Sequence, residues 1–355
     1  MITAQPSRAV STDTGPSLMA RETAEAPAAV RRMIEQNAEA CRTLGARLRQ
    51  TPPRFVVTCA RGSSDSAATY AKYLIELRLG VVAASVGPSV SSIYRARLNM
   101  RDSLFLAISQ SGRSPDILAL AEAARADGAL TVAIVNDEAS PLAATCEVVL
   151  PLHAGSERSV AATKSYLTSL AAVLQIVAEW CADPALGAAV GRLPDTLATA
   201  ATLDWQIAAA PLAAARNLFV VGRGVGFAAA QEIALKLKET CGIHAEALSA
   251  AELIHGPTAL AGADFPVLFV GQDDESLAAL METATTLSAR DVPVMIAAPG
   301  KGGVGTALTV VAGLHPFVQP IATVQSFYRL ADAVARARGH DPDRPSHLRK
   351  VTETW

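Results

Sequence analysis

The sequence is poor in aromatic and charged residues and contains no cluster of basic side chains. Aromatic residues make up 5% of the chain, charged residues make up 18%, and the formal net charge is −2. A surface that binds nucleic acid needs a dense basic patch to neutralise phosphates. We therefore expect neither DNA nor RNA as a partner.

Cysteine is also scarce, and long apolar runs are absent. The cysteines are odd in number and scattered, with no C-x-x-C pair: Cys41, Cys59, Cys146, Cys181 and Cys241. This pattern disfavours a disulfide framework or a thiolate zinc site and favours a reducing compartment. No apolar run approaches the roughly 20 residues that span a bilayer, and the Ser-, Thr- and Pro-rich N-terminus does not resemble a secretory signal. We expect a cytoplasmic protein with no membrane partner.

The chain does contain an internal repeat. At an offset of 162 residues, positions 54–136 match positions 216–298 without a gap. For example, the segment 103–110, SLFLAISQ, aligns with the segment 265–272, FPVLFVGQ. Each copy consists of short, β-branched apolar runs, turns that are mostly rich in Gly or Ser, and helical stretches. With 355 residues, half of them hydrophobic, the chain is long enough for two domains.

Short apolar strands that alternate with helices predict buried parallel sheets. We therefore expect an α/β fold with two tandem doubly wound, flavodoxin-like parallel-sheet domains. The expected boundaries are a disordered tail over 1–20, a first domain over 21–200, a second domain over 201–340 and a C-terminal tail over 341–355. Ligands of such sheets bind at the carboxyl ends of the strands, where these turns lie.

Two turns of the first copy are rich in hydroxyl groups. They are Arg61-Gly-Ser-Ser-Asp-Ser66 and Ser109-Gln-Ser-Gly-Arg-Ser114, and each follows a predicted strand and opens a predicted helix. Backbone N–H groups at helix N-termini and nearby hydroxyls attract anions. Helix capping alone would explain one such turn, but two turns on adjacent strands favour a phosphate site.

The second copy lacks this character. Its equivalent turns contain the bulky segment Val225-Gly-Phe227 and the acidic segment Asp273-Asp-Glu275. We therefore expect one phosphate site per chain, formed by the two serine-rich turns of the first copy, and we call these two turns the phosphate cradle. The turns also lack the lysine of a G-x-x-x-x-G-K-[ST] loop, which disfavours a nucleoside triphosphate.

One helix of the second copy has an acid–base pattern. Glu232, Lys236 and Glu239 are spaced i, i+4 and i+7 and therefore share one face. Two carboxylates beside an ammonium in a partly dry site could have pKa values far apart, as proton transfer requires. A solvated, salt-bridged face is the alternative. Downstream, Gly-Pro after His255 predicts a turn that could present the imidazole.

No metal site is predicted. His244, Glu246 and Glu252 show no spacing that is typical of metal ligands, and neither H-E-x-x-H nor G-x-S-x-G occurs. The residues by themselves thus indicate an anion-binding α/β protein with a candidate acid–base helix and no cofactor.

Several motifs together resemble the sugar isomerase (SIS) double-domain family, and most closely the isomerase half of glucosamine-6-phosphate synthase. The motifs are the tandem repeat, SQSG at 109–112, VAATK at 160–164, LKLKE at 235–239, HAEA at 244–247 with ELIHGP at 252–257, and the tail RPSHLRK at 344–350. The resemblance covers nearly everything after residue 20. It implies two α/β domains and a phosphosugar ligand.

The resemblance also implies roles for individual residues. The phosphate-binding residues would be Ser64, Ser109, Gln110, Ser111 and Ser114, with Ser63 and the Val160 backbone near the sugar. Glu239 would move a proton between C1 and C2, with help from Lys236. His255 would open the sugar ring from the neighbouring subunit of a homodimer. Lys350 would form an imine with the open-chain ketose.

Two departures from the family pattern shape the expected function. Ala162 replaces a serine of the sugar pocket, and the glutaminase domain of the synthase is missing. A stand-alone isomerase half is better suited to releasing ammonia than to fixing it. We therefore expect a glucosamine-6-phosphate deaminase that forms fructose 6-phosphate. The alternatives are an aldose–ketose phosphosugar isomerase, an ammonia-dependent synthase-like isomerase, an enzyme for a related aminosugar phosphate, and a non-catalytic phosphosugar sensor.

Overall fold

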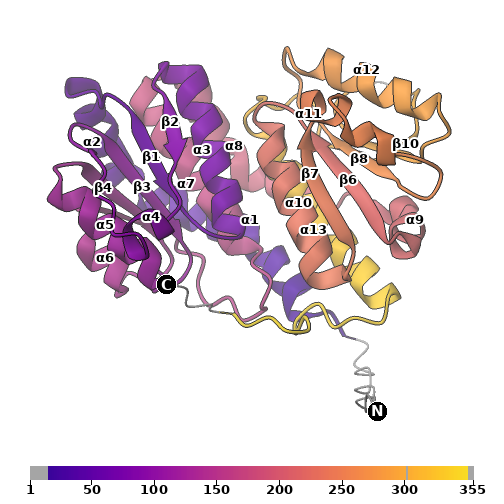
Figure 1. Cartoon of the computed structure of the whole chain (residues 1–355), viewed down its shortest axis with the longest axis horizontal. Coiled ribbons are helices and arrows are strands. Elements are labelled where there is room, and N and C mark those ends of the chain that lie inside the picture. Colours follow the sequence, from indigo (N-terminus) through magenta and orange to yellow (C-terminus); the bar gives the residue numbers. More distant parts are fainter. Residues whose placement is uncertain (1–14, 301–302, 351–355) are drawn as a thin grey trace.

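Each half of the internal repeat forms a five-stranded parallel sheet (Figure 1). The computed structural model describes residues 15–300 and 303–350. The strand orders are β2-β1-β3-β4-β5 and β7-β6-β8-β9-β10, so the two sheets have the same topology. This is the flavodoxin-like order of doubly wound folds. The predicted α/β class with two tandem parallel sheets is confirmed.

The first lobe contains the strands β1 (Val56–Cys59), β2 (Ala83–Ser85), β3 (Leu104–Ser109), β4 (Leu130–Val135) and β5 (Val148–Pro151). Its helices are α1 (Leu18–Gln36), α2 (Ala38–Gln50), α3 (Ser63–Leu79), α4 (Ser89–Ser92), α5 (Pro115–Ala126), α6 (Pro141–Thr145), α7 (Lys164–Cys181) and α8 (Pro184–Ala200). Strand β1 pairs with β2 on one side and with β3 on the other.

The second lobe contains the strands β6 (Asn217–Gly222), β7 (His244–Ser249), β8 (Val267–Val270), β9 (Val294–Ala297) and β10 (Thr306–Ala307). Its helices are η1 (Gln206–Ala208), α9 (Ala209–Ala214), α10 (Gly226–Cys241), α11 (Ala250–Ile254), η2 (Pro257–Leu260), α12 (Leu277–Ser288) and α13 (Gln319–Ala337). None of the helices within the described ranges is long and apolar enough to cross a membrane.

Alternation along the buried strands divides the core. In β3, Leu104 and Leu106 face the helices α2, α3 and α7, whereas Phe105 packs on the opposite face with α5 and α6. In the second sheet, Leu268 joins the same large core as Leu104, together with α10 and α13. One hydrophobic core therefore runs between the two sheets, and α3 and α10 lie next to each other within it. This contact brings the first-copy turns close to the acid–base helix.

The segment that follows α13 runs below the second lobe towards the first (Figure 1, yellow). Within it, the Asp343 carboxylate accepts hydrogen bonds from the backbone N–H groups of Leu18 (2.7 Å) and Met19 (2.8 Å). Those N–H groups open α1 and would otherwise lack partners. The disordered tail expected over 1–20 falls mainly on residues outside the described part, and α1 begins at Leu18. The predicted boundaries at 200 and 340 stay predictions.

Candidate active site

The two serine-rich turns of the first copy lie side by side at the carboxyl ends of β1 and β3. Arg61, in the first turn, donates hydrogen bonds to Asp116 at the start of α5, with Nη2 2.6 Å and Nε 3.2 Å from Oδ2. Asp116 is fully buried, whereas the Arg61 side chain is about half exposed. Removing a buried carboxylate from its cation is costly, so this ion pair fixes the position of one turn relative to the other.

The second turn has a tightly determined backbone. Gly112 has a φ of 61°, and a Cβ at this position would lie 2.3 Å from the hydroxyl of Ser140. A side chain is therefore excluded both by conformation and by space. The hydroxyl of Ser109 accepts the N–H of Gly112 at 3.0 Å and leaves its own proton available.

Within the described residues, the side chains of these turns make few hydrogen bonds of their own. The Ser114 hydroxyl makes no cap hydrogen bond although the residue begins α5, and the Ser111 hydroxyl accepts only a long contact of 3.4 Å from the Arg113 N–H. Ser64 and Gln110 are half-buried. The structure thus gathers Ser64, Ser109, Gln110, Ser111 and Ser114 at two helix N-termini, which suits an anion. That a phosphate binds there stays a prediction.

The equivalent turn of the second copy is closed by its own glutamine. Gln272, which aligns with Gln110, is buried and donates from Nε2 to the Arg223 carbonyl (3.0 Å), Asp274 (2.8 Å) and Ser276 (2.8 Å). Its side chain occupies the space next to Gly226, where a Cβ would lie 2.3 Å from Oε1. The Gln272 side chain therefore leaves no room for a phosphate in this turn of the second copy, which agrees with a cradle in the first copy only.

The acid–base helix is α10, and its charged face is buried. Lys236 lies between two carboxylates: its Nζ is 3.6 Å from Glu232 Oε1 and forms a short ion pair with Glu239. The side chains of Glu232 and Lys236 are 0% and 1% exposed, and that of Glu239 is 24% exposed. The alternative of a solvated surface is wrong for this face. Glu239 is the member of the triad that a substrate can reach.

Burial and neighbouring charges set the ionisation of this triad. Burial raises the pKa of Glu232 to about 7, against the lowering effects of Lys236, of the hydrogen bond from Tyr328 and of the nearby Ser63 hydroxyl. Burial by itself lowers the pKa of Lys236, but Glu232 and Glu239 together raise that pKa above its usual value. Lys236 thus stays an ammonium, and Glu232 is close to half-protonated at neutral pH. The effect of Ser63 on the Glu232 pKa indicates that the first serine-rich turn lies near the triad.

A buried carboxylate that the sequence did not single out, Glu157, lies in the same region. Its Oε1 accepts the N–H groups of Thr163 (2.9 Å) and Ser165 (3.1 Å), and its Oε2 accepts the Ser165 hydroxyl (2.6 Å) and Lys350 Nζ (2.8 Å). Burial by itself raises the pKa of Glu157, but Lys350 and these hydrogen bonds bring it below its usual range. The charge of Glu157 also raises the pKa of Lys236.

The tail lysine therefore lies inside the site. The position of Lys350 near the end of the sequence does not by itself indicate a function, and only the family resemblance predicted a role for it. The Val160 N–H, expected near the sugar, donates to the Asp343 carbonyl of the tail at 3.4 Å. The neighbouring Ala162 is half-buried. Loop 155–163 and the tail are thus joined to each other, and the charge effect of Glu157 on Lys236 indicates that they lie near the triad.

His255 is the one predicted catalytic residue that the single chain does not bring to the triad. It follows α11 on the second lobe, and its side chain is exposed. Ile254 and Leu260 beside it are also exposed, at 59% and 62%. In the predicted shared site, His255 would therefore have to come from a second copy of the chain.

Neither metal ligands nor reactive thiols form a second candidate site among the described residues. No three His, Cys, Asp or Glu side chains within the described residues are grouped in a way that could hold a metal ion. All the cysteines are free thiols, and burial raises the pKa of Cys41 and of Cys59 to about 12. Such thiols are poor nucleophiles at neutral pH.

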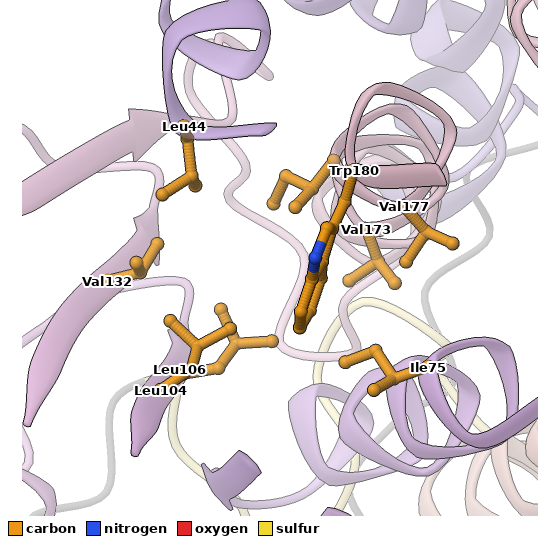
Figure 2. Close-up of a pocket in the computed structure, with 9 residues that line it drawn as sticks. Leu44, Ile75, Leu104, Leu106, Val132, Val173, Val177 and Trp180 are labelled. Atoms are coloured by element: carbon orange, nitrogen blue, oxygen red, sulfur yellow. The ribbon is translucent and has the colours of Figure 1, made fainter. Parts of the chain in front are cut away.

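An enclosed apolar cavity lies elsewhere in the first lobe (Figure 2). Trp180 and Val173 from α7 line it together with Leu104 and Leu106 from β3 and Leu44 from α2. Its volume is about 10 Å³, about the smallest that holds one water molecule, and its lining has no polar surface. It is a packing defect of the core and not a ligand site.

Comparisons with known proteins agree with this geometry. The profile of the SIS domain matches residues 52–178 and 211–300. A glutamine–fructose-6-phosphate aminotransferase (isomerizing) from Symbiobacterium thermophilum is 34% identical over 316 residues, covering 84% of this chain and 51% of the relative. The chain thus spans about half the length of the curated relatives it matches.

Two solved structures extend the comparison. A provisionally assigned phosphosugar isomerase from Silicibacter pomeroyi DSS-3 superposes with a TM-score of 0.89 at 44% identity, covering 92% of this chain and 100% of that chain. The C-terminal domain of glucosamine-fructose-6-phosphate aminotransferase from Francisella tularensis has a TM-score of 0.83 at 26% identity, covering 94% of this chain and 100% of that chain.

Proposed function

The chain belongs to the SIS domain family, and we propose that it converts glucosamine 6-phosphate and water into fructose 6-phosphate and ammonia. The observation that carries this proposal is the buried triad of Glu232, Lys236 and Glu239 next to the serine-rich turns of the other lobe. One end of the site suits a dianion, and the other holds a carboxylate that can exchange a proton.

The phosphate binds in the first-copy turns and fixes the sugar. Once the ring is open, Glu239 removes the proton from C2 and returns it to C1, which converts the amino-aldehyde into a C2 ketimine. Water then hydrolyses the ketimine to the C2 ketone and releases ammonia. Proton transfers by a positioned side chain contribute on the order of 10²–10⁴-fold each. Lys236 stabilises the carboxylate form of Glu239 through their ion pair.

Lys350 is suited to imine exchange at C2 because its amine lies within the same charged region. Attack of the lysine amine on C2 of the ketimine releases ammonia and forms a lysine imine, and water then hydrolyses this imine to the C2 ketone and frees the lysine. A role for the thiols is not part of the proposal, since Cys41 and Cys59 are buried with raised pKa values.

We further propose that two copies share each active site, with His255 opening the ring bound by the other copy. The support is the exposed imidazole, flanked by the exposed apolar side chains of Ile254 and Leu260. Exposed apolar groups that cluster on a surface are typical of contact sites. A closed twofold assembly would place one His255 at each site.

A direct test is an ammonia-release assay on glucosamine 6-phosphate, galactosamine 6-phosphate and a fructosamine phosphate. We expect turnover of glucosamine 6-phosphate, its loss in Glu239→Gln, and normal turnover in the control Glu282→Gln, which alters an exposed carboxylate on α12. A Glu239→Gln protein with more than about a tenth of wild-type turnover would remove Glu239 from the base role.

The similarity to the provisionally assigned phosphosugar isomerase supports a second candidate, an aldose–ketose isomerase without ammonia chemistry. The same triad would move the proton between C1 and C2 of a hexose phosphate that has no amino group. Interconversion of glucose 6-phosphate and fructose 6-phosphate, with no ammonia released from any aminosugar, would favour this candidate. Binding of these sugars without any turnover would indicate a sensor.

A further inference from the structure

We propose that Glu157 is a positioning residue that draws the C-terminal tail into the site and holds Lys350 beside the acid–base triad. The tail-holding part of this inference stands on the contacts alone, and its effect on turnover rests on the proposed function. Lys350 Nζ lies 2.8 Å from Glu157 Oε2, although the two residues are 193 positions apart in the chain.

Glu157 is a preformed receptor for a cation. Its side chain is fully buried, and donors of its own loop and of α7, the N–H groups of Thr163 and Ser165 and the hydroxyl of Ser165, fix both carboxylate oxygens. A buried carboxylate with fixed oxygens is strongly stabilised by an ammonium. Lys350 supplies that ammonium and is itself only 23% exposed.

Independent contacts guide the tail to this receptor. Asp343 accepts the N–H groups of Leu18 and Met19 through its carboxylate and the Val160 N–H through its carbonyl. The tail is thus attached both to the start of α1 and to the loop that carries Glu157. With Asp343 fixed, Lys350 lies only seven positions further along the sequence, so the lysine is confined to the neighbourhood of the receptor.

Helix α1 supports the receptor loop from the other side. Glu22, which is buried, accepts the N–H groups of Arg158 and Ser159 at 2.5 Å and 3.1 Å. The loop therefore keeps its shape without the tail, and the tail adds a charge to a site that already exists. This separates the positioning role of Glu157 from a role in folding the loop.

The first experiment measures tail attachment without any substrate. The full chain is treated with trypsin under native conditions, and mass spectrometry follows cleavage after Arg349. We expect Glu157→Gln to increase this cleavage rate by about 10- to 100-fold, the effect of losing one hydrogen bond between charged groups. Glu157→Asp should restore part of the protection. The control Glu147→Gln, which alters an exposed ion pair with Arg47 on the same lobe, should leave the rate unchanged.

The second experiment is a double-mutant cycle on turnover of glucosamine 6-phosphate. If Glu157 acts through Lys350, Glu157→Gln lowers kcat in the wild-type background and has no further effect in a Lys350→Met background. KM should change little in either variant, because the phosphate cradle is untouched.

The outcomes are distinct. Unchanged cleavage in Glu157→Gln, or a further loss of kcat in the Lys350→Met background, would overturn the positioning role. If Glu157→Gln does not fold, Lys350→Met decides the question, since it keeps the Arg349 cleavage site and must show the same faster cleavage. If the wild type turns over no aminosugar phosphate, the proposed function fails and the trypsin experiment still decides whether Glu157 holds the tail.

Discussion

Replacing Glu232 by glutamine should change how the stability of the protein depends on pH. Glu232 is fully buried, and its pKa in the folded protein is about 7, above its ordinary value of 4.5. A carboxyl group whose pKa is raised on folding binds its proton more tightly in the folded state. Its protonated form is therefore favourable at low pH, and the folded state loses stability as pH rises from about 4.5 through about 7.

The magnitude follows from that difference in pKa. One pKa unit corresponds to about 1.4 kcal/mol, so ionising Glu232 costs the folded state about 3 kcal/mol above pH 7. Glutamine resembles the protonated acid: it keeps an oxygen that can accept the Tyr328 hydroxyl, now at 2.8 Å from Glu232 Oε1. Lys236 keeps its second partner, Glu239.

The assay is urea denaturation of wild type and Glu232→Gln at pH 5, 6, 7 and 8. Relative to wild type, the free energy of unfolding of the variant should increase by about 2.5 kcal/mol between pH 5 and pH 8, because a part of the cost is already present at pH 5. Glu282→Gln, at an exposed position on α12, should show a constant difference. If the difference for Glu232→Gln is also constant with pH, Glu232 does not titrate near neutrality and our account of the triad is wrong.

Three further predictions concern the turns and the assembly. Gly112→Ala should lower the free energy of unfolding by at least about 1–2 kcal/mol, because alanine resists a left-handed backbone and its methyl group has no room; chemical denaturation measures this. Ser111→Ala should raise KM by about 10- to 100-fold with little change in kcat, whereas Asp273→Ala should leave both constants unchanged; comparable effects of the two would mean that the cradle is placed wrongly. Mixing inactive His255→Ala and Glu239→Gln proteins under subunit exchange should restore roughly a quarter of wild-type activity, and a mixture that stays inactive despite confirmed exchange would put both residues in one chain.

The fold could be predicted because the repeat is visible in the amino-acid sequence. Apolar runs at a constant offset specify the same strands twice, and the two sheets indeed share one strand order. The pattern could not predict that α1 and the C-terminal tail contact each other. The contact between Asp343 and Leu18 joins residues 325 positions apart, and no local periodicity encodes such a pair.

The candidate site was predictable in part. Spacing alone placed Glu232, Lys236 and Glu239 on one face, but it could not tell a solvated face from a buried one, because burial depends on packing against α3 and α13. Glu157 was missed because a single glutamate in an irregular loop has no periodic signal. The sequence shows only that Glu157 lies in a loop just before a long apolar helix, and a carboxylate in such a loop is common.

The paired glutamines show how the two copies of a duplicated fold differ at equivalent turns. Gln110 and Gln272 occupy equivalent positions, but Gln272 is buried against Gly226, whereas the first copy has Ser64 at the position equivalent to Gly226. The hydroxymethyl group of a serine at position 226 would collide with the glutamine amide. A turn like that of the first copy would therefore require a change at Gly226 together with a change in the position of Gln272. This interdependence makes the division of labour between the copies hard to reverse in evolution.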